Sequence, residues 1–174
     1  MPDGALKLRP MVISAALAAL ALVLPPAFHM VGLGSKFLPL LLPLLLNGFL
    51  VPLPWALLIG LIVPLISSLA TGMPPLYPPI AVVVALEGAT LGAVAAAIYR
   101  GKRERLWPAL IAAVIAGRAM ALGASWILAR HFGLPPTLAS VAMLIQGAPG
   151  VLLQLIVIPL VVRALASRRG ILFS

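Results

Sequence analysis

The segment Gly72–Ala89, GMPPLYPPIAVVVALEGA, determines how the rest of the chain is organised. It joins a turn with prolines at positions 74, 75, 78 and 79 to an apolar run that contains Glu87. Proline fixes φ and lacks an amide donor, so this turn is expected to be stiff. A charged side chain inside an apolar membrane segment costs about 2.5–3.5 kcal/mol on insertion and usually faces a partner or a cavity. The segment therefore predicts the rigid mouth of a binding site above a buried acid.

The composition identifies an integral membrane protein. Of the 174 residues, 63% are hydrophobic and 9% are charged, and the mean hydropathy is +1.22. A soluble domain of this size does not bury so much apolar surface. The net charge of +9 resides in basic residues at the ends of apolar runs. This placement favours the positive-inside rule over binding to nucleic acid.

Proline, glycine and charge divide the chain into six predicted transmembrane helices within one domain, an all-α fold. The apolar run after Lys7 and Arg9 resembles a signal peptide, but Pro25 and Pro26 stand where a cleavage site would be. We therefore expect a retained first helix that ends at these prolines. The predicted spans are 10–24, 37–51, 55–71, 79–100, 107–130 and 137–165.

The basic residues predict the orientation of these helices. The N-terminal segment, the loop 100–105 and the C-terminal tail contain two, four and three Lys or Arg residues. The loops on the opposite side of the membrane contain only two Lys or Arg residues, Lys36 and Arg130. The positive-inside rule then places both termini in the cytoplasm.

Four polar side chains on four predicted helices fall at a similar depth in the outer half of the membrane: Asn47, Glu87, Arg118 and Gln146. At 1.5 Å per residue, each lies roughly 12–18 Å below the outer end of its helix. One interpretation is a ligand site that uses them; the other is a Glu87–Arg118 pair that only holds the helices together. Gln154, two turns further in, is expected to form a hydrogen bond between helices.

Small residues predict close contacts between helices. Gly88, Gly92 and Ala96 follow Glu87 at a spacing of four, and Ala15 and Ala19 have the same spacing in the first helix. Such pairs let two backbones approach closely. For Ala15 and Ala19, both internal packing and a docking surface for a partner protein agree with the pattern.

Catalytic and metal chemistry find little support in the sequence. His29 and His131 fall in predicted outer loops, and no His, Asp and Glu residues have the spacing of metal ligands. No nucleophile elbow or histidine–carboxylate pair is present. The segment GLGSK at positions 32–36 lacks the full pattern of a phosphate-binding loop, so we predict no ATPase activity, enzyme activity or cofactor.

The chain resembles the substrate-specific S components of energy-coupling factor (ECF) vitamin transporters. The resemblance lies in LLPLLLNGFLVPLPWALLIGLIVPLISSLATGMPPLYPPIAVVVALEGATLG, in AGRAMALG and in GAPGVLLQLIVIPLVVRAL. It implies a six-helix protein of a bacterial or archaeal cytoplasmic membrane that binds a vitamin or precursor near the outer face. It also implies a transmembrane coupling subunit and two ATPase subunits as partners, with Ala15 and Ala19 as the docking motif.

The resemblance also assigns roles to the site residues. The gating loop would comprise Met73, Pro74, Pro75 and Pro78. The contacts to substrate would come from Glu87, Arg118, Gln146, Asn47 and Tyr77. Pantothenate-, pyridoxine-, thiamine- and deazapurine-like compounds all remain open as substrates. Two other functions also remain open: a channel or proton-coupled carrier that uses Glu87, and a structural membrane subunit without a ligand.

Overall fold

The computed structural model describes residues 3–30, 39–77, 79–133 and 147–167, together with Gly32, Phe37 and Ile145. These residues form an all-helical bundle without strands. Five of the described helical segments are long and apolar enough to cross a membrane, and a sixth apolar helix is shorter. The predicted fold class is thereby confirmed. The helices are α1 (Asp3–Met30), α3 (Leu41–Leu50), α4 (Leu53–Thr71), α5 (Ile80–Tyr99), α6 (Leu106–Phe132) and α8 (Ala148–Ser167), and a 3₁₀ turn, η1 (Arg103–Arg105), precedes α6.

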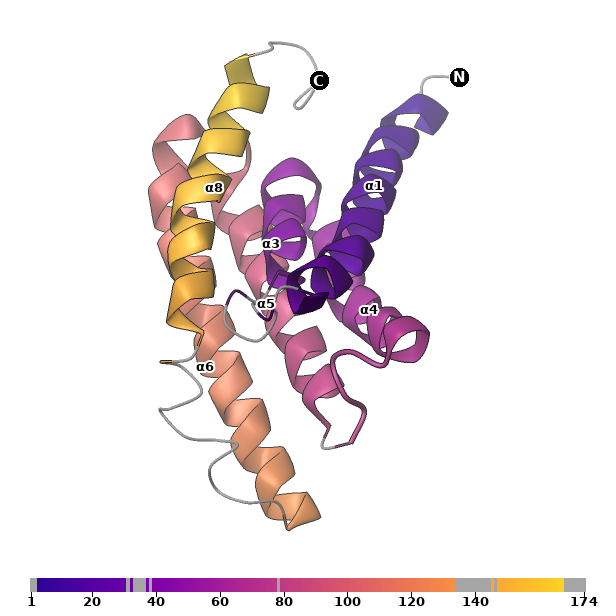
Figure 1. Ribbon diagram of the computed structural model, residues 1–174. Coiled ribbons are helices and arrows are strands. Elements are labelled where there is room, and N and C mark those ends of the chain that lie inside the picture. Colours follow the sequence, from indigo (N-terminus) through magenta and orange to yellow (C-terminus); the bar gives the residue numbers. More distant parts are fainter. Residues whose placement is uncertain are drawn as a thin grey trace.

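The short helix α3 lies in the middle of the bundle and is in contact with α1, α4, α5 and α8 (Figure 1). Eight of its ten residues are buried, including Asn47. A helix that is surrounded by protein does not need the length of a membrane span. We predicted this helix over 37–51, but it begins only at Leu41, after a turn at Pro39. Pro43 stands in its first turn, where a missing amide donor removes no helical hydrogen bond.

Helix α1 differs most from the prediction. It was expected to end at Leu24, yet it continues through Pro25 and Pro26 to Met30. Two adjacent prolines remove two hydrogen bonds, but the amides that follow them still find carbonyl partners if the helix continues. In a bilayer an unbonded backbone group is costly, so continuation is the better solution. The N-terminal end also extends further, to Asp3.

The other boundaries agree with the prediction to within two residues where they can be compared. Helices α4, α5 and α6 correspond to the predicted spans 55–71, 79–100 and 107–130. Helix α8 runs from Ala148 to Ser167. The predicted start of this span at residue 137 lies outside the described residues.

The ends of the helices are arranged as the charge distribution predicts. The N-terminal end of α1, the segment 100–105 and the C-terminal end of α8 lie at one end of the bundle (Figure 1). The turn between α4 and α5 lies at the opposite end. The positive-inside rule assigns the first end to the cytoplasm and the second to the outside.

Helix α5 packs against α3 and α4 by direct contact between backbones. A Cβ atom at Gly60 of α4 would lie 2.6 Å from Cα of Ala89 in α5. A Cβ atom at Gly48 of α3 would lie 2.8 Å from Cα of Gly92 and still closer to its carbonyl oxygen. At Gly92 it would lie 3.1 Å from the carbonyl oxygen of Ala56. The predicted close-packing stripe of α5 is therefore confirmed at Gly92, and glycine is required at these crossings because no larger side chain fits.

We predict that Gly60→Ala lowers the stability of the empty protein by about 1–3 kcal/mol, because overpacking pushes α4 away from α5. Gly123→Ala in α6 is the matched control, since a Cβ atom there meets nothing within 4 Å. Thermal unfolding in detergent, followed by the loss of the monodisperse chromatographic peak, measures both variants. Equal midpoints for Gly60→Ala and Gly123→Ala would contradict the close contact.

Candidate functional site: a buried ion pair and an anchored outer turn

Glu87 of α5 and Arg118 of α6 form an ion pair inside the bundle. Nη2 of Arg118 lies 3.0 Å from Oε1 of Glu87, and the side chains are 14% and 2% exposed. Glu87 is seven residues from the outer end of α5 at Ile80, about 10 Å at the helical rise. The structure thus brings together the two predicted site residues of opposite charge.

Apolar side chains enclose this pair from both directions along the helices. Val83, Ala121 and Ala124 form a small buried cluster on its outer side. On its inner side, Leu91 packs against Gly117, where a Cβ atom would lie 2.7 Å from Cγ of Leu91. Charges in such surroundings are weakly screened, so the pair interacts more strongly than it would at a surface.

The ion pair retains unused hydrogen-bonding capacity. The two charged atoms are close, but they are not aligned as a hydrogen bond, and neither has another hydrogen-bond partner among the described residues. A guanidinium group has five N–H donors, and a carboxylate has two accepting oxygens. Buried polar groups normally find partners, so these atoms are suited to receive a polar ligand or ordered water.

Asn47 is buried in the centre of the bundle, where it contacts α1. It is fully buried, and its Oδ1 accepts a hydrogen bond of 3.1 Å from the hydroxyl of Ser14 in α1. Its neighbour Gly48 packs on Gly92, one turn further in than Glu87. The hydrogen bond from Ser14 joins α1 to α3, and the role of Asn47 as a substrate contact stays a prediction. Its Nδ2 has no hydrogen-bond partner among the described residues.

The two glutamines of the last predicted span have different outcomes. Gln146 lies outside the described residues. Gln154 of α8 is 1% exposed, and neither of its amide atoms is hydrogen-bonded within the described part of the chain. The predicted hydrogen bond between helices is therefore not formed there. Gln154 instead adds an unsatisfied amide to the polar interior.

The outer turn is held from below by hydroxyl groups of α4. Ser67 donates a hydrogen bond of 2.7 Å to the carbonyl of Met73, and Ser68 donates one to the carbonyl of Pro74. On the other side, the amide of Ala81 in α5 donates to the carbonyl of Pro75 at 3.0 Å. These contacts fix the predicted gating loop at both ends.

The rest of the turn faces outward. Tyr77 is 71% exposed. Pro78 lies outside the described residues. Ser67 and Ser68 were not predicted as part of the site; the available signal in the sequence was the hydroxyl-rich segment SSLAT at the end of a helix before a proline-rich segment.

The two sides of α1 have different environments. Ser14 and Ala21 are buried against the bundle, whereas Ala15 and Ala19 are exposed. Both alanines are therefore exposed in the isolated chain, as a docking surface for a partner requires. Lipid does not select for small residues, so this exposed pair remains a candidate for close approach by another helix.

Comparison with known proteins gives one match. The family described as "ECF transporter, substrate-specific component" matches residues 9–162. This range includes the ion pair, the outer turn and the exposed face of α1. The comparisons with curated proteins and with solved structures gave no match.

We predict that the Ser67→Ala/Ser68→Ala variant has a more mobile outer turn, because two hydrogen bonds to its carbonyls are lost. The chain contains no cysteine, so one introduced by Leu76→Cys can be spin-labelled selectively. The nitroxide spectrum should narrow in the double variant. Thr90→Val is the control, since the Thr90 hydroxyl donates to Leu86 within α5. Identical spectra in all three backgrounds would show that the serines do not hold the turn.

Proposed function

The chain belongs to the family of ECF transporter substrate-specific components, and from this premise we propose that it binds a small water-soluble vitamin or precursor at Glu87 and Arg118. It then delivers this ligand into the cytoplasm together with a transmembrane coupling subunit and two ATPase subunits. The outer turn acts as the gate above the site.

The observation that supports this proposal is the unsatisfied ion pair between α5 and α6. A pair that served only to join helices would gain little, since desolvation of both charges offsets their attraction. Additional hydrogen bonds to a ligand change this balance, because charge-assisted hydrogen bonds are the stronger kind. Glu87 also lies in the half of α5 that begins at Ile80, directly after the anchored turn.

The chemistry of the pair restricts the ligand to a compound with planar polar groups. Arg118 offers parallel N–H donors that match a carboxylate or a carbonyl next to a ring nitrogen. Glu87 accepts from hydroxyl or ring N–H groups. An anion such as pantothenate can displace Glu87 from Arg118, whereas a neutral or cationic heterocycle can bind between the two. The binding of a ligand to both groups is common to these alternatives.

The docking surface for the coupling subunit is proposed to be the exposed face of α1 around Ala15 and Ala19. Small side chains allow another helix to approach the backbone closely, and dispersion contacts strengthen at short distance. The opposite face of α1 is already used, because Ser14 bonds to Asn47 of α3. A partner can therefore bind on the free face without disrupting the bundle.

We predict that Glu87→Gln and Arg118→Gln each weaken ligand binding about 10- to 100-fold, since each removes a charge-assisted contact. The ligand is first identified by mass spectrometry of small molecules that copurify with the protein, and its affinity is then measured by calorimetry. Each single variant leaves one uncompensated buried charge, so the double variant should be less destabilised than the sum of the singles.

Matched controls for these changes are available at exposed positions. Glu104→Gln removes a carboxylate from the loop before α6, and Arg130→Gln removes a guanidinium from the outer end of α6. Both should bind the ligand as the unchanged protein does. Full affinity in folded Glu87→Gln and Arg118→Gln variants would contradict the proposed site. Uptake by the chain alone in liposomes, without ATPase subunits, would favour a carrier instead.

We predict that Ala19→Trp blocks copurification with the coupling subunit and ATPases while ligand binding by the isolated chain persists. A tryptophan at this exposed position keeps a partner helix at a distance. Leu20→Trp is the control, because Leu20 is an exposed large residue further around the same helix. Copurification of Ala19→Trp at full yield would exclude this docking face. Loss of folding in Ala19→Trp would show that the face is needed for internal packing.

A further inference from the structure

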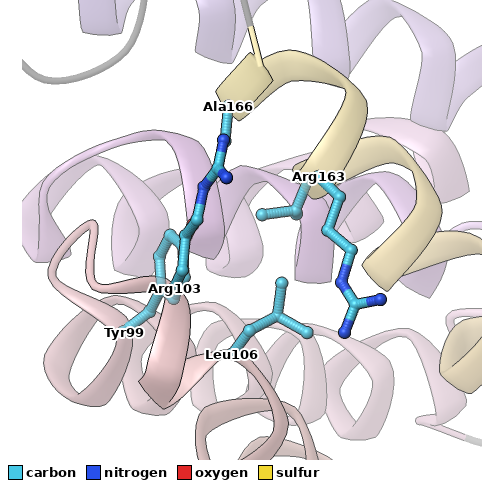
Figure 2. Close-up of a pocket in the computed structure, with 6 residues that line it drawn as sticks. Tyr99, Arg103, Leu106, Arg163 and Ala166 are labelled. Carbon is cyan, nitrogen blue, oxygen red and sulfur yellow. The ribbon is translucent and has the colours of Figure 1, made fainter. Parts of the chain in front are cut away.

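We propose that the cytoplasmic end of the bundle contains a binding site for the phosphate group of an anionic phospholipid, formed by Arg103 and Arg163. The two arginines border a pocket of about 320 Å³ between the end of α5, η1, the start of α6 and the end of α8. Figure 2 shows them on the two sides of this space. This site lies at the end of the bundle opposite the outer turn and is independent of the proposed vitamin site.

The two guanidinium groups come from segments that are distant in sequence, and no acidic residue in the described part of the chain pairs with either. Neither arginine forms an ion pair or a hydrogen bond with any described residue; the ion pair that the described residues contain is Glu87–Arg118. Even the neighbouring Glu104 is not bonded to Arg103. Two like charges around one pocket repel each other, and an anion between them relieves this repulsion.

The floor of the pocket is mainly apolar and closed. It consists of Leu106, Val162 and the ring of Tyr99, which are all buried, and the Tyr99 hydroxyl is the polar atom of this floor. Arg103 and Arg163, in contrast, are exposed to the surroundings. The pocket therefore has cationic side chains at its opening and mainly apolar side chains at its floor. This combination suits an amphipathic molecule better than a fully hydrated ion.

The surroundings place this pocket at the level of lipid headgroups. Trp107, next to Leu106, is 44% exposed, and tryptophan is enriched at the membrane–water interface. Exposed apolar residues lead toward the pocket along two helices, at a spacing of four: Ile115, Ile111 and Trp107 on α6, and Leu152, Ile156 and Leu160 on α8. These two stripes are the expected contacts of acyl chains.

The chemistry of the mouth favours a phosphate. Guanidinium groups bind phosphate oxygens through paired N–H donors, and they are less strongly hydrated than ammonium groups. Basic pockets between helices on the cytoplasmic side of membrane proteins are suited to anionic lipid headgroups. A bound lipid would connect the inner ends of α5, α6 and α8 to one another and to the inner leaflet.

The test is native mass spectrometry of the full-length chain in detergent with added phosphatidylglycerol or phosphatidylcholine of identical acyl chains. We expect phosphatidylglycerol adducts on the unchanged protein. The Arg103→Gln/Arg163→Gln variant should reduce them about tenfold. The Lys102→Gln/Arg105→Gln variant is the control, since it removes the same charge from neighbouring positions that do not line the pocket. Its adducts should remain.

Further experiments distinguish the lipid from other anions and test whether the loss of adducts reflects a folding defect. Arg103→Lys/Arg163→Lys keeps both charges but loses the planar donors, and it should bind phosphatidylglycerol at an intermediate level. An equal loss of phosphatidylglycerol adducts in the Lys102→Gln/Arg105→Gln control would overturn the proposal, because nonspecific attraction to positive charge would then explain the binding. Equal protection from thermal unfolding by inorganic phosphate and by phosphatidylglycerol would overturn the lipid as the source. If the Arg103→Gln/Arg163→Gln variant kept its lipid adducts but no longer bound the coupling subunit, the proposal would be overturned and the pocket would be a protein contact.

Discussion

The close approach of three helix backbones at glycines is the constraint on which the remaining structure depends. Gly60 of α4 and Gly48 of α3 each meet the backbone of α5, at Ala89 and Gly92. In a membrane, association of helices depends on dispersion contacts and therefore on short distances. Helix α5 is thus fixed on two sides by contacts that tolerate no additional atom. Rotation of α5 to carry a side chain elsewhere would break both crossings.

This rigidity determines the environment of Glu87. Its neighbour Gly88 faces α3 and α4, where a Cβ atom would lie 2.7 Å from Leu44 and 3.0 Å from the carbonyl of Gly60. Glu87 is consequently directed to another side of α5, where Arg118 of α6 lies 3.0 Å away. The backbone contacts of Gly88 therefore fix the orientation of the helix that carries Glu87, and the ion pair with Arg118 holds the carboxylate on that side.

Sequence reasoning identified the features that depend on local composition. The apolar runs and the proline turn predicted the helices, and the isolated charges Glu87 and Arg118 were predicted to lie at one depth, where an ion pair was one of two alternatives. It failed where the outcome depends on tertiary contacts. Continuation of α1 past Pro25 and the pairing of Asn47 with Ser14 depend on which helices are adjacent. A depth estimate along each helix gives the level of a side chain but not the direction in which it points.

Charged residues are arranged differently at the two ends of the molecule along the membrane normal. In the outer half, a cation and an anion are enclosed by apolar side chains, and their mutual attraction keeps both in place. At the inner end, Arg103 and Arg163 border a pocket without an acidic partner among the described residues. An internal pair is needed where no solvent or headgroup reaches, whereas unpaired cations are stable where anionic lipid is present. Arginine thus occurs in two environments in this protein, paired with an acid in the apolar interior and exposed at the inner end, and the depth of the residue in the membrane distinguishes the two.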